Sequence, residues 1–143
     1  MVIYLDSGDL REIEKYAPRV AGFTTNPSLL RKSGIKNYTE FAKAVLSIIG
    51  GKPVSFEVFA DDVEGIQQQA ETIASWGENI WVKVPVVSTT GISNDQIIRS
   101  IGRQGIKVNV TAVMTRQQLG ILGSELWRNT PSIISIFAGR IAD

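Results

Sequence analysis

The sequence contains no cysteine and no histidine. The absence of cysteine excludes disulfide bonds and thiol catalysis. The absence of histidine removes the commonest general base and the commonest metal ligand. If the chain is an enzyme, its catalytic side chains must therefore come mainly from lysine, aspartate, glutamate, tyrosine, serine and threonine.

The chain also lacks an excess of charge of one sign. Its 15 lysines and arginines are balanced by 14 aspartates and glutamates, which leaves a net charge of +1. Nucleic acid or an anionic membrane surface would require a broad basic field, so we expect neither as a partner. Near the N-terminus, Asp6 and Asp9 interrupt any long apolar run. We therefore expect no signal peptide, no membrane span and a cytoplasmic location.

The 143 residues have the composition of a soluble globular protein, with 43% hydrophobic and 20% charged residues. We expect one domain over residues 1–143. Short apolar runs rich in β-branched residues predict six strands, at 2–5, 20–25, 54–59, 80–84, 106–113 and 133–138. Segments with helical periodicity lie between them, at 38–49, 63–76, 95–104 and 116–127.

Strands and helices thus alternate, and the last five predicted strands begin roughly 26 to 34 residues apart, one βα unit each. This alternation predicts an α/β fold with a parallel sheet. Length favours an open doubly wound sheet, because complete (β/α)8 barrels of the TIM type usually need about 200 residues or more. Polar residues inside or just after nearly every strand favour a barrel, in which they would point to one shared place.

Lys83 lies in the segment Ile80–Pro85, whose other residues are all apolar. Burying a lysine there is costly. One interpretation is a lysine whose stem packs while its ammonium reaches solvent. The other is a desolvated amine that attacks a carbonyl, with Arg140 as a neighbouring cation.

Two carboxylates are candidates for acid and base chemistry. Asp6 follows the first strand, where it could cap a helix or transfer protons. Asp9 is closer to a helical pattern that begins at Leu10 and is therefore the better capping candidate. Glu57 lies between Phe56 and Val58 in the third strand. A carboxylate in a strand covered on both faces rarely lacks a partner or a role.

Neutral polar residues and one arginine complete the candidates. Thr24 and Asn26 follow the second strand, and Asn109 and Thr111 alternate in the fifth, so that both point to one face. They suit a polyhydroxylated substrate or a held water, or they are ordinary strand and turn residues. Arg140 is either a surface arginine or a ligand for phosphate. Since the sequence has no glycine-rich phosphate loop, we expect no nucleotide.

Six segments together resemble the transaldolase family, and more narrowly its short-chain branch, which also holds the fructose-6-phosphate aldolases. They are Tyr4–Asp6, Phe23–Ser28, Ser55–Val58, Trp81–Pro85, Val108–Thr111 and Ser135–Arg140. The resemblance implies a (β/α)8 barrel with no metal or organic cofactor. It also implies transfer of a dihydroxyacetone unit between sugar phosphates in the pentose phosphate pathway, from fructose 6-phosphate to erythrose 4-phosphate for example.

The resemblance further implies roles for individual residues. Lys83 matches the Schiff-base lysine, and Asp6 matches the carboxylate that handles a substrate hydroxyl proton during carbon–carbon cleavage. Glu57 and Thr111 match the pair that holds a catalytic water. The positions at or near the substrate are Thr24, Asn26, Asn109, Ser135 and Phe137 for the dihydroxyacetone moiety, and Arg140 for the phosphate.

Two positions separate the members of this branch. The fructose-6-phosphate aldolases tend to carry glutamine in place of Glu57 and tyrosine in place of Phe137. A carboxylate can exchange protons through its water, whereas glutamine can only orient that water. The sequence therefore favours a transaldolase, with a fructose-6-phosphate aldolase as the alternative.

The family continues beyond the match to Arg140 with two more βα units, one of which supplies a further serine to the phosphate site. We therefore expect about six of eight units here, an incomplete barrel whose unpaired edges are covered, paired with another chain or tolerated, and a homo-oligomer. A competing hypothesis is a non-catalytic fragment that binds sugar phosphate or acts in assembly. Another is an unrelated doubly wound binding domain, in which the four catalytic candidates would not share one cavity.

Overall fold

The structure, a computed structural model, describes residues 1–123 and 130–141. Its strands are β1 (Tyr4–Asp6), β2 (Gly22–Thr24), β3 (Val54–Glu57), β4 (Ile80–Pro85), β5 (Val108–Val113) and β6 (Ser132–Ile136). Its helices are α1 (Leu10–Tyr16), α2 (Pro27–Lys32), α3 (Tyr38–Ile48), α4 (Val63–Ala74), α5 (Asp95–Arg103), α6 (Arg116–Leu122) and α7 (Ala138–Ile141).

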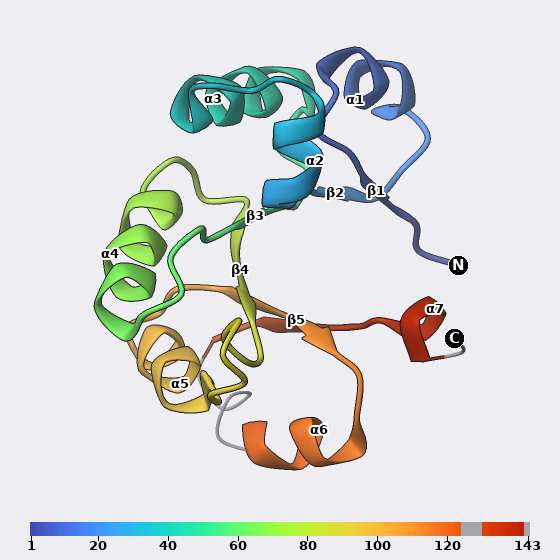
Figure 1. The fold of residues 1–143 in the computed structure, drawn as a ribbon. Helices are drawn as coiled ribbons and strands as arrows, with labels where there is room; N and C mark the ends of the chain where they lie inside the picture. Colours follow the sequence, from blue (N-terminus) through green and yellow to red (C-terminus); the bar gives the residue numbers. More distant parts are fainter. Residues whose placement is uncertain (124–129, 142–143) are drawn as a thin grey trace.

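The six strands form one parallel sheet in the order β1-β2-β3-β4-β5-β6. A doubly wound sheet reverses its strand order at a switch point, and this sheet does not. The helices α1 to α6 follow the outside of a curled sheet, while β1 and α7 border its open side (Figure 1). The fold is therefore a partial α/β barrel of the TIM type. The preference for an open sheet that chain length suggested is wrong, because βα units begin to curl before all eight are present.

All six predicted strands are present, with shifts at their ends. The sixth ends at Ile136, because α7 begins at Ala138. Helix α2 was not among the predicted helices. Pro27 occupies its first turn, where the missing N–H of proline costs nothing. The predicted helix at 116–127 is present as α6, and the last part of the predicted range, 124–127, lies outside the described residues.

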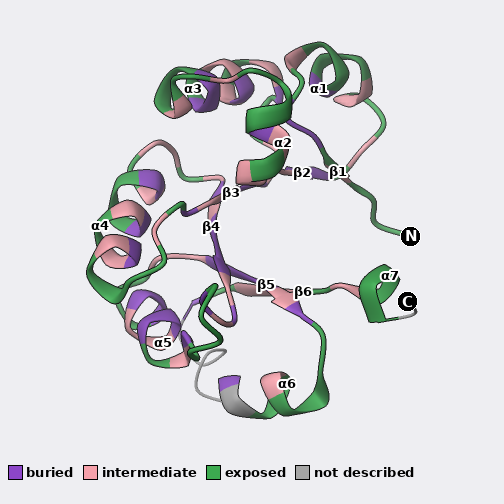
Figure 2. Cartoon of the chain, viewed as in Figure 1, coloured by how far each residue is buried: buried purple, intermediate pink, exposed green. Residues whose placement is uncertain are grey.

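The hydrophobic core lies between the sheet and the surrounding helices, where Figure 2 shows the buried residues facing each other. The strands contribute alternate residues to it, such as Phe56, Val82 and Val110, none of which is exposed. These three side chains leave the sheet on its helix-covered face. In each strand, the residues immediately before and after these three consequently point to the concave face.

Gly22 marks a close approach between β2 and its neighbours. A Cβ atom there would lie 2.3 Å from Tyr4 Cε1 and 2.8 Å from the main-chain oxygen of Pro53. We expect Gly22→Ala to lower the free energy of unfolding by about 1–3 kcal/mol, because the Pro53 backbone cannot move aside without distorting β3. Urea unfolding measures this change. Gly120→Ala in α6, where a Cβ meets no heavy atom within 4 Å, should leave stability unchanged or raise it by up to about 1 kcal/mol. Equal urea midpoints for Gly22→Ala and the parent would contradict the prediction.

Candidate active site

The carboxyl ends of the strands enclose a cavity of about 470 Å³ on the concave face of the sheet. The strand register explains the convergence, because Glu57 pairs with Lys83 and Lys83 pairs with Asn109. The lining residues are Asp6, Thr24, Asn26, Pro27, Ser28, Glu57, Lys83, Thr111, Ala112, Ser135, Ile136, Phe137 and Arg140. Every candidate from the sequence except Asn109 therefore lines this one cavity. This convergence argues against an unrelated doubly wound domain.

Lys83 is buried, with only 4% of its surface exposed. Its Nζ lies 3.3 Å from Glu57 Oε2 and donates a hydrogen bond of 3.1 Å to the main-chain oxygen of Thr25. The interpretation of a lysine whose ammonium reaches solvent is wrong, because the Lys83 side chain is only 6% exposed and its ammonium is bonded inside the fold. Its close charged partner is the Glu57 carboxylate, while Arg140 belongs to the wall of the same cavity.

Glu57 ends β3 and faces the cavity. Burial raises the pKa of this carboxyl, and the neighbouring Lys83 ammonium offsets part of that increase, while Asp6 adds a smaller repulsion. A carboxyl whose pKa is raised can both accept and release a proton closer to neutral pH than an ordinary glutamate. Glu57 is therefore suited to proton exchange beside an amine.

The raised pKa of Glu57 predicts a pH dependence of stability. The folded protein keeps this proton above about pH 4.3, where an unfolded glutamate releases it. The contribution to stability is thus complete below that pH and is lost as pH rises through the folded-state pKa of Glu57. The free energy lost is about 1.4 kcal/mol for each pH unit by which folding raises this pKa. Glu57→Gln should lack this component of the slope. Urea unfolding of both proteins across a pH series checks this, and identical slopes would contradict it.

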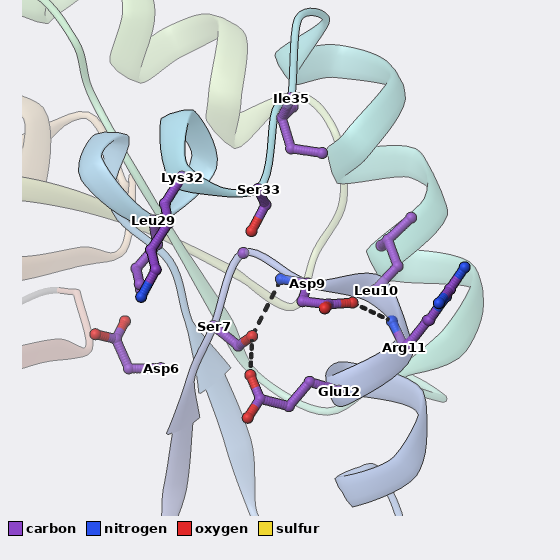
Figure 3. A pocket seen from close by; sticks show the side chains of 11 residues that line it. Asp6, Ser7, Asp9, Leu10, Arg11, Glu12, Leu29, Lys32, Ser33 and Ile35 are labelled. Atoms are coloured by element: carbon purple, nitrogen blue, oxygen red, sulfur yellow. Dashed lines mark hydrogen bonds between the residues drawn. The ribbon is translucent and has the colours of Figure 1, made fainter.

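Asp6 ends β1 with its carboxylate at the cavity. It accepts hydrogen bonds from Thr24 Oγ1 (2.6 Å) and Asn26 Nδ2 (3.3 Å). As predicted, Asp9 rather than Asp6 caps α1, since its Oδ1 accepts from the Arg11 main-chain N–H at 2.8 Å. Figure 3 shows the Asp6 side chain pointing away from the bonded group around Asp9. Asp6 is consequently free to meet a ligand.

Asn26 has two tasks in the structure. Its Oδ1 accepts from the Leu29 main-chain N–H at 3.0 Å, which caps α2, and its Nδ2 donates to Asp6. The cap fixes the side chain at the start of α2. Asn26 therefore orients the Asp6 carboxylate as well as lining the cavity.

A second cavity of about 550 Å³ lies beside the first, between the β1–α1 loop and α2, and Asp6 lines both. In it, the Ser7 hydroxyl donates to Glu12 Oε2 at 2.5 Å (Figure 3). Its cationic side chains, Arg11 and Lys32, belong to exposed residues. It lacks a buried amine paired with a carboxylate, so the cavity with Lys83 is the candidate for catalysis.

Three polar side chains form a hydrogen-bonded network beside the cavity, in which Ser55 and Asn109 are buried and Ser135 is half-buried. Asn109 Nδ2 donates to Ser55 Oγ at 2.9 Å, and Ser135 Oγ donates to Asn109 Oδ1 at 2.7 Å. Ser55 was not among the sequence candidates. Its position two residues before Glu57 in the same strand places it on the same face, and this period of two could have identified it. The network fixes Ser135, which lines the cavity.

Thr111 supplies an unsatisfied polar group to the site. Its Oγ1 is buried and has no hydrogen-bond partner within the described part of the chain. The next residue, Ala112, has φ +58°, and the pairing of β5 with β6 is irregular between Val110 and Val113. Such a conformation is strained for alanine and is found most often at functional sites. A buried hydroxyl without a partner beside a cavity is suited to bind a water or a ligand.

Phe137 and Arg140 approach the cavity from the end of the sheet. Phe137 follows β6, and Arg140 lies in the short helix α7, which is held by a bond of 3.0 Å from the Arg140 main-chain N–H to the Phe137 oxygen. The residue Arg140 is exposed and lines the rim. Arg140 thus places a positive charge at the rim of the cavity, while Lys83 is the cation among its buried lining residues.

Over the described ranges 1–123 and 130–141, no helix is long and apolar enough to cross a membrane. Within the same ranges no group of three or more aspartates and glutamates is placed to hold a metal ion.

Comparisons with known proteins agree with this geometry. The model of the family described as "Transaldolase/Fructose-6-phosphate aldolase" matches residues 3–143. Proteins named "Probable transaldolase" are 33% identical in Methanococcus maripaludis (strain C5) and 32% identical in Dehalococcoides mccartyi. Each match covers the whole chain, which spans 63% of the length of either relative. The chain belongs to the transaldolase/fructose-6-phosphate aldolase family.

Proposed function

We propose that this chain carries the chemistry of a transaldolase. It would transfer a dihydroxyacetone unit from a ketose phosphate such as fructose 6-phosphate to an aldose phosphate such as erythrose 4-phosphate, through a Schiff base on Lys83. The observation that carries the proposal is the buried Lys83 ammonium, 3.3 Å from Glu57, in a cavity that also contains Asp6 and Thr111. An amine held in this way is a typical nucleophile for carbonyl substrates.

In the first step, Lys83 Nζ, having given up a proton, attacks the C2 carbonyl carbon of the ketose. A carbon–nitrogen bond forms, the former carbonyl oxygen gains protons and leaves as water, and an imine remains. Glu57 is close enough to take and return these protons, and its raised pKa suits that exchange. The Thr111 hydroxyl, which has no hydrogen-bond partner in the described residues, would hold a water together with Glu57.

In the second step, Asp6 takes the proton of the C4 hydroxyl group. The C3–C4 bond breaks, its electron pair moves toward the imine to give an enamine, and the aldehyde leaves. The acceptor aldehyde then reacts in the reverse sense, Asp6 returns the proton, and hydrolysis frees Lys83. Thr24 and Asn26 support this role, because their hydrogen bonds hold both oxygens of the Asp6 carboxylate.

Substrate contacts follow from the rest of the wall. Ser135, Thr24 and Asn26 offer neutral hydrogen-bonding groups to the hydroxyls of a sugar. Asn109 holds Ser135 through a hydrogen bond, and Phe137 supplies an apolar surface. Arg140 at the rim is suited to bind the terminal phosphate through paired hydrogen bonds. A linear sugar phosphate with its carbonyl at Lys83 would therefore extend toward α7.

A fructose-6-phosphate aldolase is the second candidate, because the matching family includes both activities. Glu57 favours the transaldolase, since a carboxylate beside Lys83 can carry protons. Turnover of fructose 6-phosphate with and without erythrose 4-phosphate separates the two. Strict dependence on the acceptor supports the transaldolase, and free dihydroxyacetone accumulating without an acceptor supports the aldolase.

The third candidate is a non-catalytic piece that binds sugar phosphate or acts in assembly. Two observations favour it. The chain spans 63% of the length of its relative in Methanococcus maripaludis. The outer edges of β1 and β6 pair with no strand in the described residues. Measured turnover at a level normal for the family would exclude it. Binding of fructose 6-phosphate without turnover would instead support it and contradict the transaldolase.

We propose further that residues 1–143 form one domain of a cytoplasmic enzyme of the pentose phosphate pathway, and that it associates as a homo-oligomer. One continuous cluster of buried residues from Ile13 to Leu122 supports a single domain. Exposed apolar residues near the two open edges, including Val2, Ile3 and Ile136, support association. Light scattering of the purified chain measures its mass in solution.

A further inference from the structure

Tyr38 connects an outer helix with the catalytic strands. It is the first residue of α3, and its hydroxyl donates a hydrogen bond of 2.9 Å to the main-chain oxygen of Glu57. This oxygen lies at the last residue of β3, the point from which the Glu57 carboxyl enters the cavity. Tyr38 does not line that cavity. Its hydroxyl therefore acts on the backbone behind the site.

The ring of Tyr38 is held in a fixed orientation. It makes edge-to-face contacts with Phe56, Phe59 and Trp76 at centroid distances of 5.9, 4.9 and 5.3 Å. Such aromatic pairs stabilise a defined geometry beyond simple burial. The hydroxyl consequently has one direction available, toward the ends of β2 and β3.

The end of the neighbouring strand β2 meets β3 at Thr25, whose main-chain N–H donates a hydrogen bond of 3.0 Å to the Ser55 oxygen. Thr25 is fully buried, and its main-chain oxygen accepts the hydrogen bond from Lys83 Nζ. The backbone at the end of β2 thus holds Lys83, and the Tyr38 hydroxyl holds the backbone of Glu57. Burial raises the pKa of Tyr38, so the group stays a protonated donor at neutral pH.

We propose that Tyr38 is a positioning residue that sets the distance between Lys83 and Glu57. The proposal rests on the proposed Schiff-base function for its effect on rate, and on the observed contacts alone for its effect on the ion pair. Without the hydroxyl, the main-chain oxygen of Glu57 loses its hydrogen bond to α3, and the carboxyl moves away from the amine. Proton exchange during imine formation should then slow, while substrate binding at Ser135 and Arg140 should not change.

The test variant is Tyr38→Phe, which removes the hydroxyl and keeps the ring in its aromatic contacts. Tyr16→Phe in α1 is the matched control, because it removes a hydroxyl away from the cavity. For Tyr38→Phe we expect kcat to fall about 10- to 100-fold with KM nearly unchanged.

A titration of Glu57 by ¹³C NMR of its side-chain carboxyl provides a readout that needs no turnover. The charged groups facing Glu57 are Lys83 and Asp6, and the ring that keeps water out remains in Tyr38→Phe. A longer distance to Lys83 should therefore raise the titration midpoint of Glu57 above that of the parent, whereas Tyr16→Phe should leave it unchanged. A midpoint in Tyr38→Phe equal to or below that of the parent would overturn the positioning role. If the parent itself shows no turnover, the transferase proposal fails, and this titration still decides the role of Tyr38.

Discussion

Replacing Lys83 by methionine should lower turnover of fructose 6-phosphate by about four orders of magnitude or more, the loss typical of removing a catalytic nucleophile. Methionine keeps the length of the side chain but has no nitrogen to form an imine. The variant should still fold, because Glu57, whose pKa is already raised by burial, can take up a proton instead of remaining charged without a partner.

Lys107→Met is the control for a general effect of removing a lysine. Its ammonium lies over the ring of Trp81, 4.3 Å from the centroid. Lys107 directly precedes β5 and therefore lies at the opposite end of the strands from the cavity. It should keep the turnover of the parent. Steady-state assays of both variants with erythrose 4-phosphate as the acceptor make the comparison. A Lys83→Met protein that keeps substantial turnover would show that the nucleophile lies elsewhere.

Asp6→Asn should separate the two halves of the reaction. The amide cannot take the C4 hydroxyl proton, so we expect turnover to fall by about 10²- to 10⁴-fold. The imine on Lys83 should still form, because that step depends on Glu57 and not on Asp6. Turnover and borohydride trapping, measured on the same protein, give the two readouts.

Asp9→Asn is the matched control for Asp6→Asn. Asp9 lies three residues later, and asparagine caps a helix about as well as aspartate, so stability and turnover should both be retained. Loss of the trapped imine in Asp6→Asn would contradict the division of roles. Equal losses of turnover in the two variants would show that the charge near β1 matters generally and that proton transfer by Asp6 is not the cause.

The concave wall of the site could be predicted from the sequence because strands have a period of two. Once Lys83 is placed in a strand, its parallel neighbours present Glu57 and Asn109 on the same face, and the register confirms both pairings. The capping role of Asp9 was likewise predictable, since it depends on local spacing. Local rules therefore determined which residues share a face.

Features that depend on tertiary packing could not be predicted. The direction in which the sheet curls depends on how the helices pack, and chain length gave the wrong preference. The contact between Tyr38 and the Glu57 backbone joins residues 19 positions apart through a turn and a helix. The left-handed conformation of Ala112 has no sequence signal, because the strained residue is not a glycine. The contact of Tyr38 with the Glu57 backbone, and the lack of a partner for the Thr111 hydroxyl among the described residues, therefore depend on tertiary structure.

The proposed function requires Lys83 to form the covalent intermediate with the donor ketose. The most direct measurement is peptide mapping by mass spectrometry after the protein is incubated with fructose 6-phosphate and borohydride. The mechanism predicts a phosphate-free, three-carbon adduct on the peptide that contains Lys83, because the aldehyde phosphate leaves before reduction. An unmodified Lys83, or an adduct on any other lysine, would contradict it.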